Sequence, residues 1–253
     1  SAFDKLLHIC ESLGIETVIC TTADDVKTAI AAHDTGRELN AAILSGASQH
    51  SVVNKVKQDV LRMNASVMTQ LEVPVLGICF GMHIMAAIYG GLCKRIVTKH
   101  DSDARMLTTK EPGVMLRGVQ DVFVAHHAHD DIVVEVPPGF FATAHLQQRG
   151  PKGEKLITAF ESPKYRRYGV AFHPEHRTNP NDAAARTLLK FLKNAGGHAF
   201  PACAEINTEL ARASRSARSR RRGASAARTG WRRAARRATT RTTRRRAPRG
   251  RSG

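Results

Sequence analysis

The sequence lacks several features that would place it in particular classes of protein. No apolar run approaches the ~18 residues that a membrane-spanning helix needs, and no signal peptide is recognisable. The 5 cysteines are an odd number and include no Cys-x-x-Cys pair, which argues against a disulfide framework and against a zinc knuckle. We therefore expect a reducing, cytoplasmic compartment, no membrane partner and no structural metal.

Acidic residues and lysine are both absent from the last part of the chain. From position 212 to the end there are 17 arginines, no lysine and no acid. The other 22 basic residues are matched by all 22 acids of the chain, so the formal charge of +17 belongs to this tail alone. The rest of the chain is formally neutral, which gives no reason to expect nucleic-acid binding by a folded domain.

The tail, which we place at residues 198–253, is dominated by Ala, Ser, Thr, Gly and Arg and is predicted to be disordered. Three interpretations remain open. It binds RNA or DNA by counterion release through the Arg-rich part from position 212 on, in which Trp231 is the only stacking residue. Alternatively, Arg-rich blocks such as Arg220-Arg221-Arg222 serve as a nuclear localisation signal. Finally, an out-of-frame reading of GC-rich coding sequence would give the same composition without lysine.

Helical and strand patterns alternate before the tail. Helical spacing of apolar residues occurs over 3–13, 24–33, 52–63, 82–89 and 182–194, and strands are predicted over 17–20, 41–44, 73–78 and 168–172. Further short β segments lie around 122–124, 132–136, 142–146 and 156–160. This order predicts a parallel sheet covered by helices, with a β-rich insert.

Cys79 lies in Gly77-Ile78-Cys79-Phe80-Gly81, between an apolar strand and a helical pattern. The Gly-x-Cys-x-Gly spacing is the thiol version of a nucleophile elbow, a tight turn that presents its central side chain at the carboxyl edge of a sheet. The helix that follows would offer free N–H groups and the positive end of its dipole, which favour a thiolate. Cys79 is therefore predicted to be a nucleophile.

A base for this nucleophile is expected where the last strand pattern ends, in His173-Pro174-Glu175. Residues i and i+2 of an extended chain point to the same side, so the Glu175 carboxylate could fix the tautomer of the His173 imidazole. An oxyanion hole is expected from the N–H of Phe80, with a second donor from Gly46-Ala47.

Three segments together resemble a class I glutamine amidotransferase domain: Gly77 to Met82, Leu44 to Gly46 and Gly169 to Glu175. The resemblance covers about residues 1–194, within a domain that we place at 1–197. It implies a flavodoxin-like three-layer α/β sandwich with a mostly parallel central sheet and no cofactor. It also implies that glutamine is the substrate and that an ammonia-accepting synthetase domain or subunit is the partner.

The resemblance assigns each catalytic residue a role. Cys79 would attack the carboxamide of glutamine to form a glutamyl thioester. His173 would act as general base and then as general acid, oriented by Glu175.

Some positions depart from the family pattern. Ser45-Gly46-Ala47-Ser48 stands where the family usually has Ser-Gly-Gly-Pro, and His83 stands where it usually has Gln. The family's first central strand normally precedes the first helix, whereas this sequence begins with that helix. We therefore expect the first strand to be missing and the domain to be N-terminally truncated.

Within the family, the Cys-aromatic-Gly-Met pattern is most similar to the glutaminase part of GMP synthetase. Phe123-Val124-Ala125-His126, with Asp130 shortly after, is a loose match to the Ser-His-Gly-Asp loop of that enzyme. The expected oxyanion and substrate-binding residues are Gly46, Ala47, Phe80, Gly81, His83, Ala125 and His126.

Other functions are compatible with the same residues. A γ-glutamyl hydrolase or peptidase would use the same triad without ammonia transfer, and a pseudoenzyme could bind nucleic acid through its tail. The run from His126 to Asp131 superficially resembles a His-x-His-x-Asp metal motif, but it lacks the further His of a two-metal hydrolase, so we expect no metal there.

Overall fold

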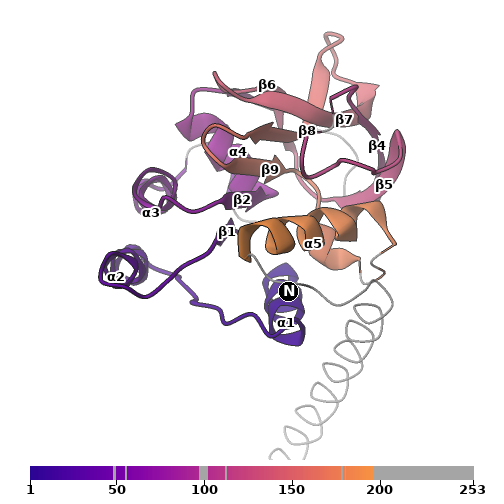
Figure 1. Cartoon of the computed structure of the whole chain (residues 1–253). Helices are drawn as coiled ribbons and strands as arrows, with labels where there is room; N and C mark the ends of the chain where they lie inside the picture. Colours follow the sequence, from indigo (N-terminus) through magenta and orange to yellow (C-terminus); the bar gives the residue numbers. More distant parts are fainter. Residues whose placement is uncertain are drawn as a thin grey trace, which may run out of the picture. The chain divides into compact units, whose positions relative to one another are not determined.

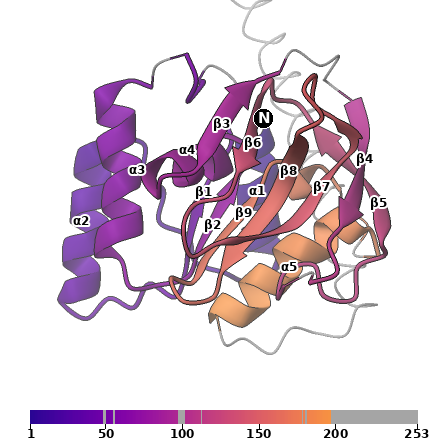
Figure 2. The same cartoon turned by 90° about the horizontal axis from the view of Figure 1, so that it is seen from above.

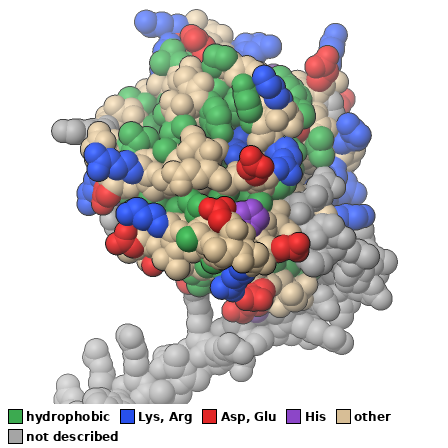
Figure 3. Space-filling model, turned by 60° about the vertical axis from the view of Figure 1, so that its left-hand side comes forward, with side chains coloured by type: hydrophobic (Ala, Val, Ile, Leu, Met, Phe, Trp, Pro, Cys, Tyr) green, Lys and Arg blue, Asp and Glu red, His purple; other side chains and the backbone are tan. Residues whose placement is uncertain are grey.

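A computed structural model of the chain describes residues 1–47, 50–54, 56–96, 102–111, 113–177, 179 and 181–196 (Figure 1). The predicted tail at 198–253 lies outside these residues, so its boundary and all three interpretations of it stay predictions. In the described part, basic and acidic side chains are interspersed on the face shown in Figure 3, as expected from its formal neutrality. No helix of the described part is long and apolar enough to cross a membrane.

The described elements alternate at first between helix and strand and then become β-rich. The helices are α1 (Ala2–Ser12), α2 (Ala23–Asp34), α3 (Gln58–Gln70), α4 (Phe80–Ile88), the short 3₁₀ helix η1 (Pro174–His176) and α5 (Ala183–Gly196). The strands are β1 (Ala42–Leu44), β2 (Val75–Ile78), β3 (Leu92–Arg95), β4 (Ser102–Thr108), β5 (Val122–His127), β6 (Asp131–Glu135), β7 (Phe141–Arg149), β8 (Lys155–Ser162) and β9 (Arg167–Val170).

The described strands form one mixed sheet in the order β1-β2-β9-β8-β7-β4-β5, with β6 pairing β3 and β8. The pairs β1–β2 and β2–β9 are parallel, whereas the remaining pairs are antiparallel. The predicted α/β class is confirmed, but the sheet that we expected to be mostly parallel has parallel pairing only among β1, β2 and β9 of the described strands. Because the carboxyl ends of parallel strands meet at one edge, these three strands bring their following loops together.

Helices cover both faces of the parallel part of the sheet (Figure 2). On one face, α1 and α5 pack through residues such as Leu6, Ile9 and Leu188. On the other face, α2, α3 and α4 contribute residues such as Val26 and Met68 to a second core. Both helix layers bury apolar stripes against the sheet, which gives the expected three-layer arrangement.

Arg167 links β9 to the end of α3 through hydrogen bonds. The residue is 6% exposed, and its guanidinium donates to the carbonyl oxygens of Met68 at 2.7 Å, Leu71 at 3.0 Å and Val73 at 2.7 Å. The last carbonyl groups of a helix have no intrahelical donor. The buried guanidinium therefore supplies hydrogen bonds to carbonyl oxygens that would otherwise have no donor. This contact fixes the approach of α3 to the strand that leads to His173.

Two sequence-based predictions of elements are wrong. Residues 17–20 form no strand, although Val18 and Ile19 have high β propensity. The partner of β1 is β2, and residues 17–20 have no strand partner among the described residues. The helix expected at 52–63 begins only at Gln58 and extends to Gln70. The backbone N–H groups of Val52 and Val53 instead donate to a carboxylate from a distant strand.

Candidate active site

Cys79 occupies a strained turn between β2 and α4. Its φ of 54° and ψ of −112° lie in a region that residues other than glycine rarely adopt. A Cβ at Gly77 would lie 2.5 Å from the carbonyl oxygen of Gly81, and a Cβ at Gly81 would collide with the backbone of Leu44. Both flanking glycines are therefore needed for close backbone approach, as expected for a nucleophile elbow.

The turn places Cys79 at the amino end of α4. The carbonyl of Cys79 accepts the first helical hydrogen bonds, from the N–H groups of Met82 at 3.0 Å and His83 at 3.2 Å. The preceding N–H groups, those of Phe80 and Gly81, belong to the first turn, which has no intrahelical acceptors. The amino end of α4 can therefore stabilise negative charge that develops next to the sulfur.

His173 and Glu175 form a buried pair at the end of β9. The Nδ1 atom of His173 lies 2.6 Å from Oε1 of Glu175, and the two residues are 7% and 3% exposed. Burial alone would lower the pKa of His173, but hydrogen bonds with Cys79 and Glu175 raise it to about 10. The structure thus brings Cys79 close to the hydrogen-bonded pair of His173 and Glu175, in which the imidazolium is favoured.

Gly46 packs directly against Cys79 and His173. A Cβ built on this residue would lie 2.9 Å from Cε1 of His173 and 3.2 Å from Cβ of Cys79. The loop after β1 therefore reaches the reacting sulfur, as expected for a segment that supplies an oxyanion donor. Ala47, its neighbour, packs partly buried against the apolar core around α4.

We expect Gly46→Ala to lower kcat of the expected glutamine hydrolysis about 100-fold, because the added methyl group would displace the imidazole or the sulfur by several tenths of an ångström. Ala47→Gly is the matched control, since it restores the second glycine of the family pattern in the same loop. Steady-state kinetics and thermal unfolding of both variants would check this. Near-normal kcat in a folded Gly46→Ala protein would contradict the close packing of Gly46 against His173 and Cys79.

The other predicted substrate residues lie at different depths. His126, in β5, is partly exposed and stacks on His176 with ring centroids 4.5 Å apart, and its carbonyl accepts the N–H of His173 at 2.9 Å. Ala125 faces the core and is fully buried. The contact of His126 with the His173 backbone brings its strand to the triad, whereas any contribution from Ala125 would have to come through its backbone.

His83 lies in the interior beside the elbow. It is 0% exposed, its ring centroid lies 4.5 Å from that of His129, and neither of its ring nitrogens has a hydrogen-bond partner within the described part of the chain. Burial, with further contributions from His129, His127 and His173, holds its pKa well below the ordinary value. His83 is therefore a neutral imidazole behind the nucleophile, and its role toward substrate stays a prediction.

His176 follows Glu175 directly in η1. Burial, aided by the charge of Lys5, lowers its pKa to about 4, so that it is neutral near pH 7. Its ring centroid lies 5.1 Å from that of His173. The sequence did not point to His176, because nothing in His173-Pro174-Glu175 shows whether the histidine that follows faces solvent or the site.

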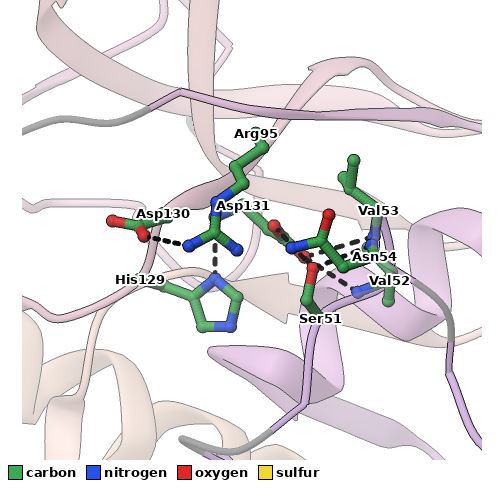
Figure 4. Close-up of polar contacts among 8 residues, drawn as sticks. All are labelled: Ser51, Val52, Val53, Asn54, Arg95, His129, Asp130 and Asp131. Atoms are coloured by element: carbon green, nitrogen blue, oxygen red, sulfur yellow. Dashed lines mark hydrogen bonds and ion pairs between the residues drawn. The ribbon is translucent and has the colours of Figure 1, made fainter.

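Asp131 anchors the segment that follows the Gly46 loop (Figure 4). Its carboxylate is fully buried and accepts from the hydroxyl of Ser51 at 2.7 Å and from the N–H of Val52 at 2.8 Å. Its own N–H donates to Nδ1 of His129 at 2.9 Å, which links the anchor to the ring beside His83. The sequence gave no indication of this contact, because Ser51 and Asp131 are 80 positions apart in the chain.

We expect Asp131→Asn to destabilise the protein by about 1–3 kcal/mol, because the amide replaces one acceptor oxygen by an NH₂ donor and removes the charge that strengthens the hydrogen bonds to the buried carboxylate. Asp130→Asn is the matched control: Asp130 forms a partly exposed ion pair with Arg95, which should contribute about 0–1 kcal/mol. Urea unfolding of both variants measures the difference. Equal losses in the two would contradict a specific anchor.

The described cysteines other than Cys79 are poor nucleophiles. Burial raises the pKa of Cys10 to about 11, and burial together with the charge of Asp131 raises that of Cys93 to about 12. The pKa of Cys20 is also raised, by burial and by Asp25. These thiols stay protonated near neutral pH, which makes Cys79 the described cysteine equipped for attack.

Comparisons with known proteins agree with this geometry. The family model for glutamine amidotransferase class-I matches residues 1–191. The chain is 39% identical over 119 residues to a GMP synthase [glutamine-hydrolyzing] of Parafrankia sp., which covers 46% of this chain and 21% of that protein. It is 36% identical over 173 residues to the enzyme of that name from Anaplasma marginale, which covers 64% of this chain and 30% of the relative. The chain thus spans less than a third of these relatives.

Solved structures show the same fold at low sequence identity. A GMP synthase component from Thermoplasma acidophilum superposes with a TM-score of 0.59 at 15% identity, over 77% of this chain and 88% of that one. The glutaminase domain of Trypanosoma brucei CTPS, with bound acivicin, gives 0.58 at 15% identity, over 79% and 89%. The expected assignment is confirmed at family level: the chain belongs to the class I glutamine amidotransferases.

Proposed function

We propose that the chain hydrolyses glutamine to glutamate and ammonia through Cys79, His173 and Glu175. The observation that carries the proposal is the strained Cys79 at the amino end of α4, close to a histidine whose pKa is raised to about 10 by Cys79 and Glu175 against the effect of burial. An imidazolium at this position favours a thiolate on its partner.

Acylation begins when His173 holds the proton of Cys79. The sulfur attacks the carboxamide carbon of glutamine, and the carbonyl oxygen becomes an oxyanion. The N–H of Phe80 and a backbone donor from Gly46 or Ala47 would stabilise this charge. His173 then gives its proton to the amide nitrogen, the C–N bond breaks, ammonia leaves and a glutamyl thioester remains.

Deacylation repeats these steps with water. His173, now neutral, takes a proton from water as the oxygen attacks the thioester carbon. The C–S bond breaks, glutamate leaves and the thiolate–imidazolium pair is restored. Glu175 holds the imidazole in one orientation throughout and compensates its positive charge. We assign Gly81, His83, His126 and the backbone of Ala125 to the walls of the glutamine site.

We propose further that the ammonia passes to a synthetase partner in guanine nucleotide synthesis, in the cytoplasm. The relatives named GMP synthase [glutamine-hydrolyzing] support this acceptor, and the chain covers only about 21–30% of their length. The synthetase function would then be supplied outside the region that matches.

The test is release of glutamate and ammonia from glutamine, alone and with the ATP-pyrophosphatase part of a GMP synthetase added in trans. We expect glutaminase activity that rises with the partner and ammonia that appears in GMP. Cleavage of γ-glutamyl peptides in preference to glutamine would instead support the hydrolase alternative. Failure of both reactions in a folded protein with its partner would overturn the proposal.

A further inference from the structure

His176 adds a third metal-ligating side chain to a pair that catalysis already uses. One ligand atom from each of His173, Glu175 and His176 lies within 4.8 Å of the other two, and this is the only such group of three among the residues that the structure describes. The turn of η1 brings them together, since Pro174 starts the short helix and the next two residues carry the carboxylate and the imidazole. The proposed glutaminase reaction needs the first two residues and gives His176 no role.

A buried oxygen without a partner in the cluster points to a ligand. Oε2 of Glu175 is buried and has no hydrogen-bond partner within the described residues, although this side chain is 3% exposed. A buried carboxylate oxygen without a donor is costly unless another group satisfies it. The ring of His176 is also held in place, because it stacks on His126 with an interplanar angle of 19°.

The donor set selects the class of cation. Two imidazole nitrogens and one carboxylate oxygen match the ligands of Zn²⁺ and similar transition metals, whereas Mg²⁺ and Ca²⁺ prefer oxygen ligands alone. Metal–ligand bonds of about 2.0–2.2 Å in a tetrahedron place the ligand atoms roughly 3.4 Å apart. Side-chain rotations that move these atoms by about an ångström would therefore bring all three within bonding distance of one metal ion. A fourth position would remain for water.

We propose that His173, Glu175 and His176 form an inhibitory site for Zn²⁺. The metal takes the lone pair of a His173 nitrogen, and the proton that this nitrogen carries in the imidazolium is released to solvent. No redox change or co-reactant is needed. With the metal bound, His173 can neither hold the proton of Cys79 nor orient itself on Glu175, so the triad is switched off. Only this inhibition rests on the proposed function; the binding itself does not.

Binding is tested first, on the full chain and without an activity assay. We expect wild type and Cys79→Ala to bind one Zn²⁺ each in competition with a chromophoric chelator, and His176→Gln to bind it at least about tenfold more weakly. His145→Gln, which removes an imidazole from β7, is the matched control and should bind as wild type does. Substitution by Co²⁺ should give d–d bands without a thiolate-to-metal charge-transfer band, because the ligands are nitrogen and oxygen.

Inhibition by bound Zn²⁺ is tested by comparing the rate of glutamine hydrolysis without and with the metal. The concentration that halves the rate should rise at least about tenfold in His176→Gln and stay unchanged in His145→Gln. Metal binding that depends on His176 in a protein without glutaminase activity would support the site while the proposed function fails. Equal Zn²⁺ affinity of wild type and His176→Gln, or a thiolate band that vanishes in Cys79→Ala, would overturn the site.

Discussion

Cys79→Ala should abolish glutamine hydrolysis, with a loss of about 10⁶-fold in kcat, while the protein stays folded. The loss is this large because the sulfur forms and breaks the covalent intermediate, and the remaining members of a triad contribute little without their nucleophile. The turn itself should tolerate the change, because replacement of a residue at φ 54° by a smaller one adds no collision there. Glutamate release and thermal unfolding of the same preparation measure both quantities.

A diazo-oxo-norleucine, which mimics glutamine and traps the nucleophile, gives a direct readout of the same site. Intact mass should show one adduct on wild type, peptide mapping should place it on Cys79, and Cys79→Ala should stay unlabelled. Cys10→Ala is the matched control, because burial raises the pKa of that thiol to about 11 and it should contribute no adduct. Labelling of Cys79→Ala at the wild-type rate would show that another residue is the nucleophile.

The elbow could be predicted from sequence because its determinants are local. Gly77 and Gly81 lie two positions from Cys79, and the structure shows that each has no room for a side chain. The contact between His173 and Glu175 was also expected from their spacing, although on the assumption of an extended chain; in the structure the turn of η1, which starts at Pro174, brings the two side chains together. What brings the two motifs together is the parallel pairing of β2 with β9, in which Gly77 lies opposite Gly169.

The errors arose where partners far along the chain decide the structure. Residues 17–20 have the composition of a strand but form no ladder, and strand propensity alone cannot supply hydrogen-bond partners. The helix expected from residue 52 starts six residues late because Asp131 takes the N–H groups of Val52 and Val53. β3 and β4 were missed as well, since each strand depends on pairing within the antiparallel insert.

Glu175→Gln should lower kcat about 10⁴-fold, although the substitution is nearly isosteric. An amide can present an NH₂ group to Nδ1 of His173, which favours the wrong tautomer, and it no longer compensates an imidazolium. The carboxylate also helps to raise the pKa of His173 to about 10, so its loss should lower that pKa and move the alkaline limb of the pH–rate profile to lower pH. Asp182→Asn, which removes a distant carboxylate that pairs with Arg177, is the control.

The same pKa predicts how stability depends on pH. A histidine whose pKa rises on folding from 6.5 to about 10 contributes stability that is fully present below pH 6.5 and is lost as the pH rises through about 10. Urea unfolding of wild type between pH 6 and 10.5 should therefore show a decline toward pH 10, and Glu175→Gln should show a smaller decline that is complete at lower pH. Identical pH dependence in the two proteins would mean that Glu175 does not hold the proton on His173, and the triad would then lack the group that keeps its imidazole charged.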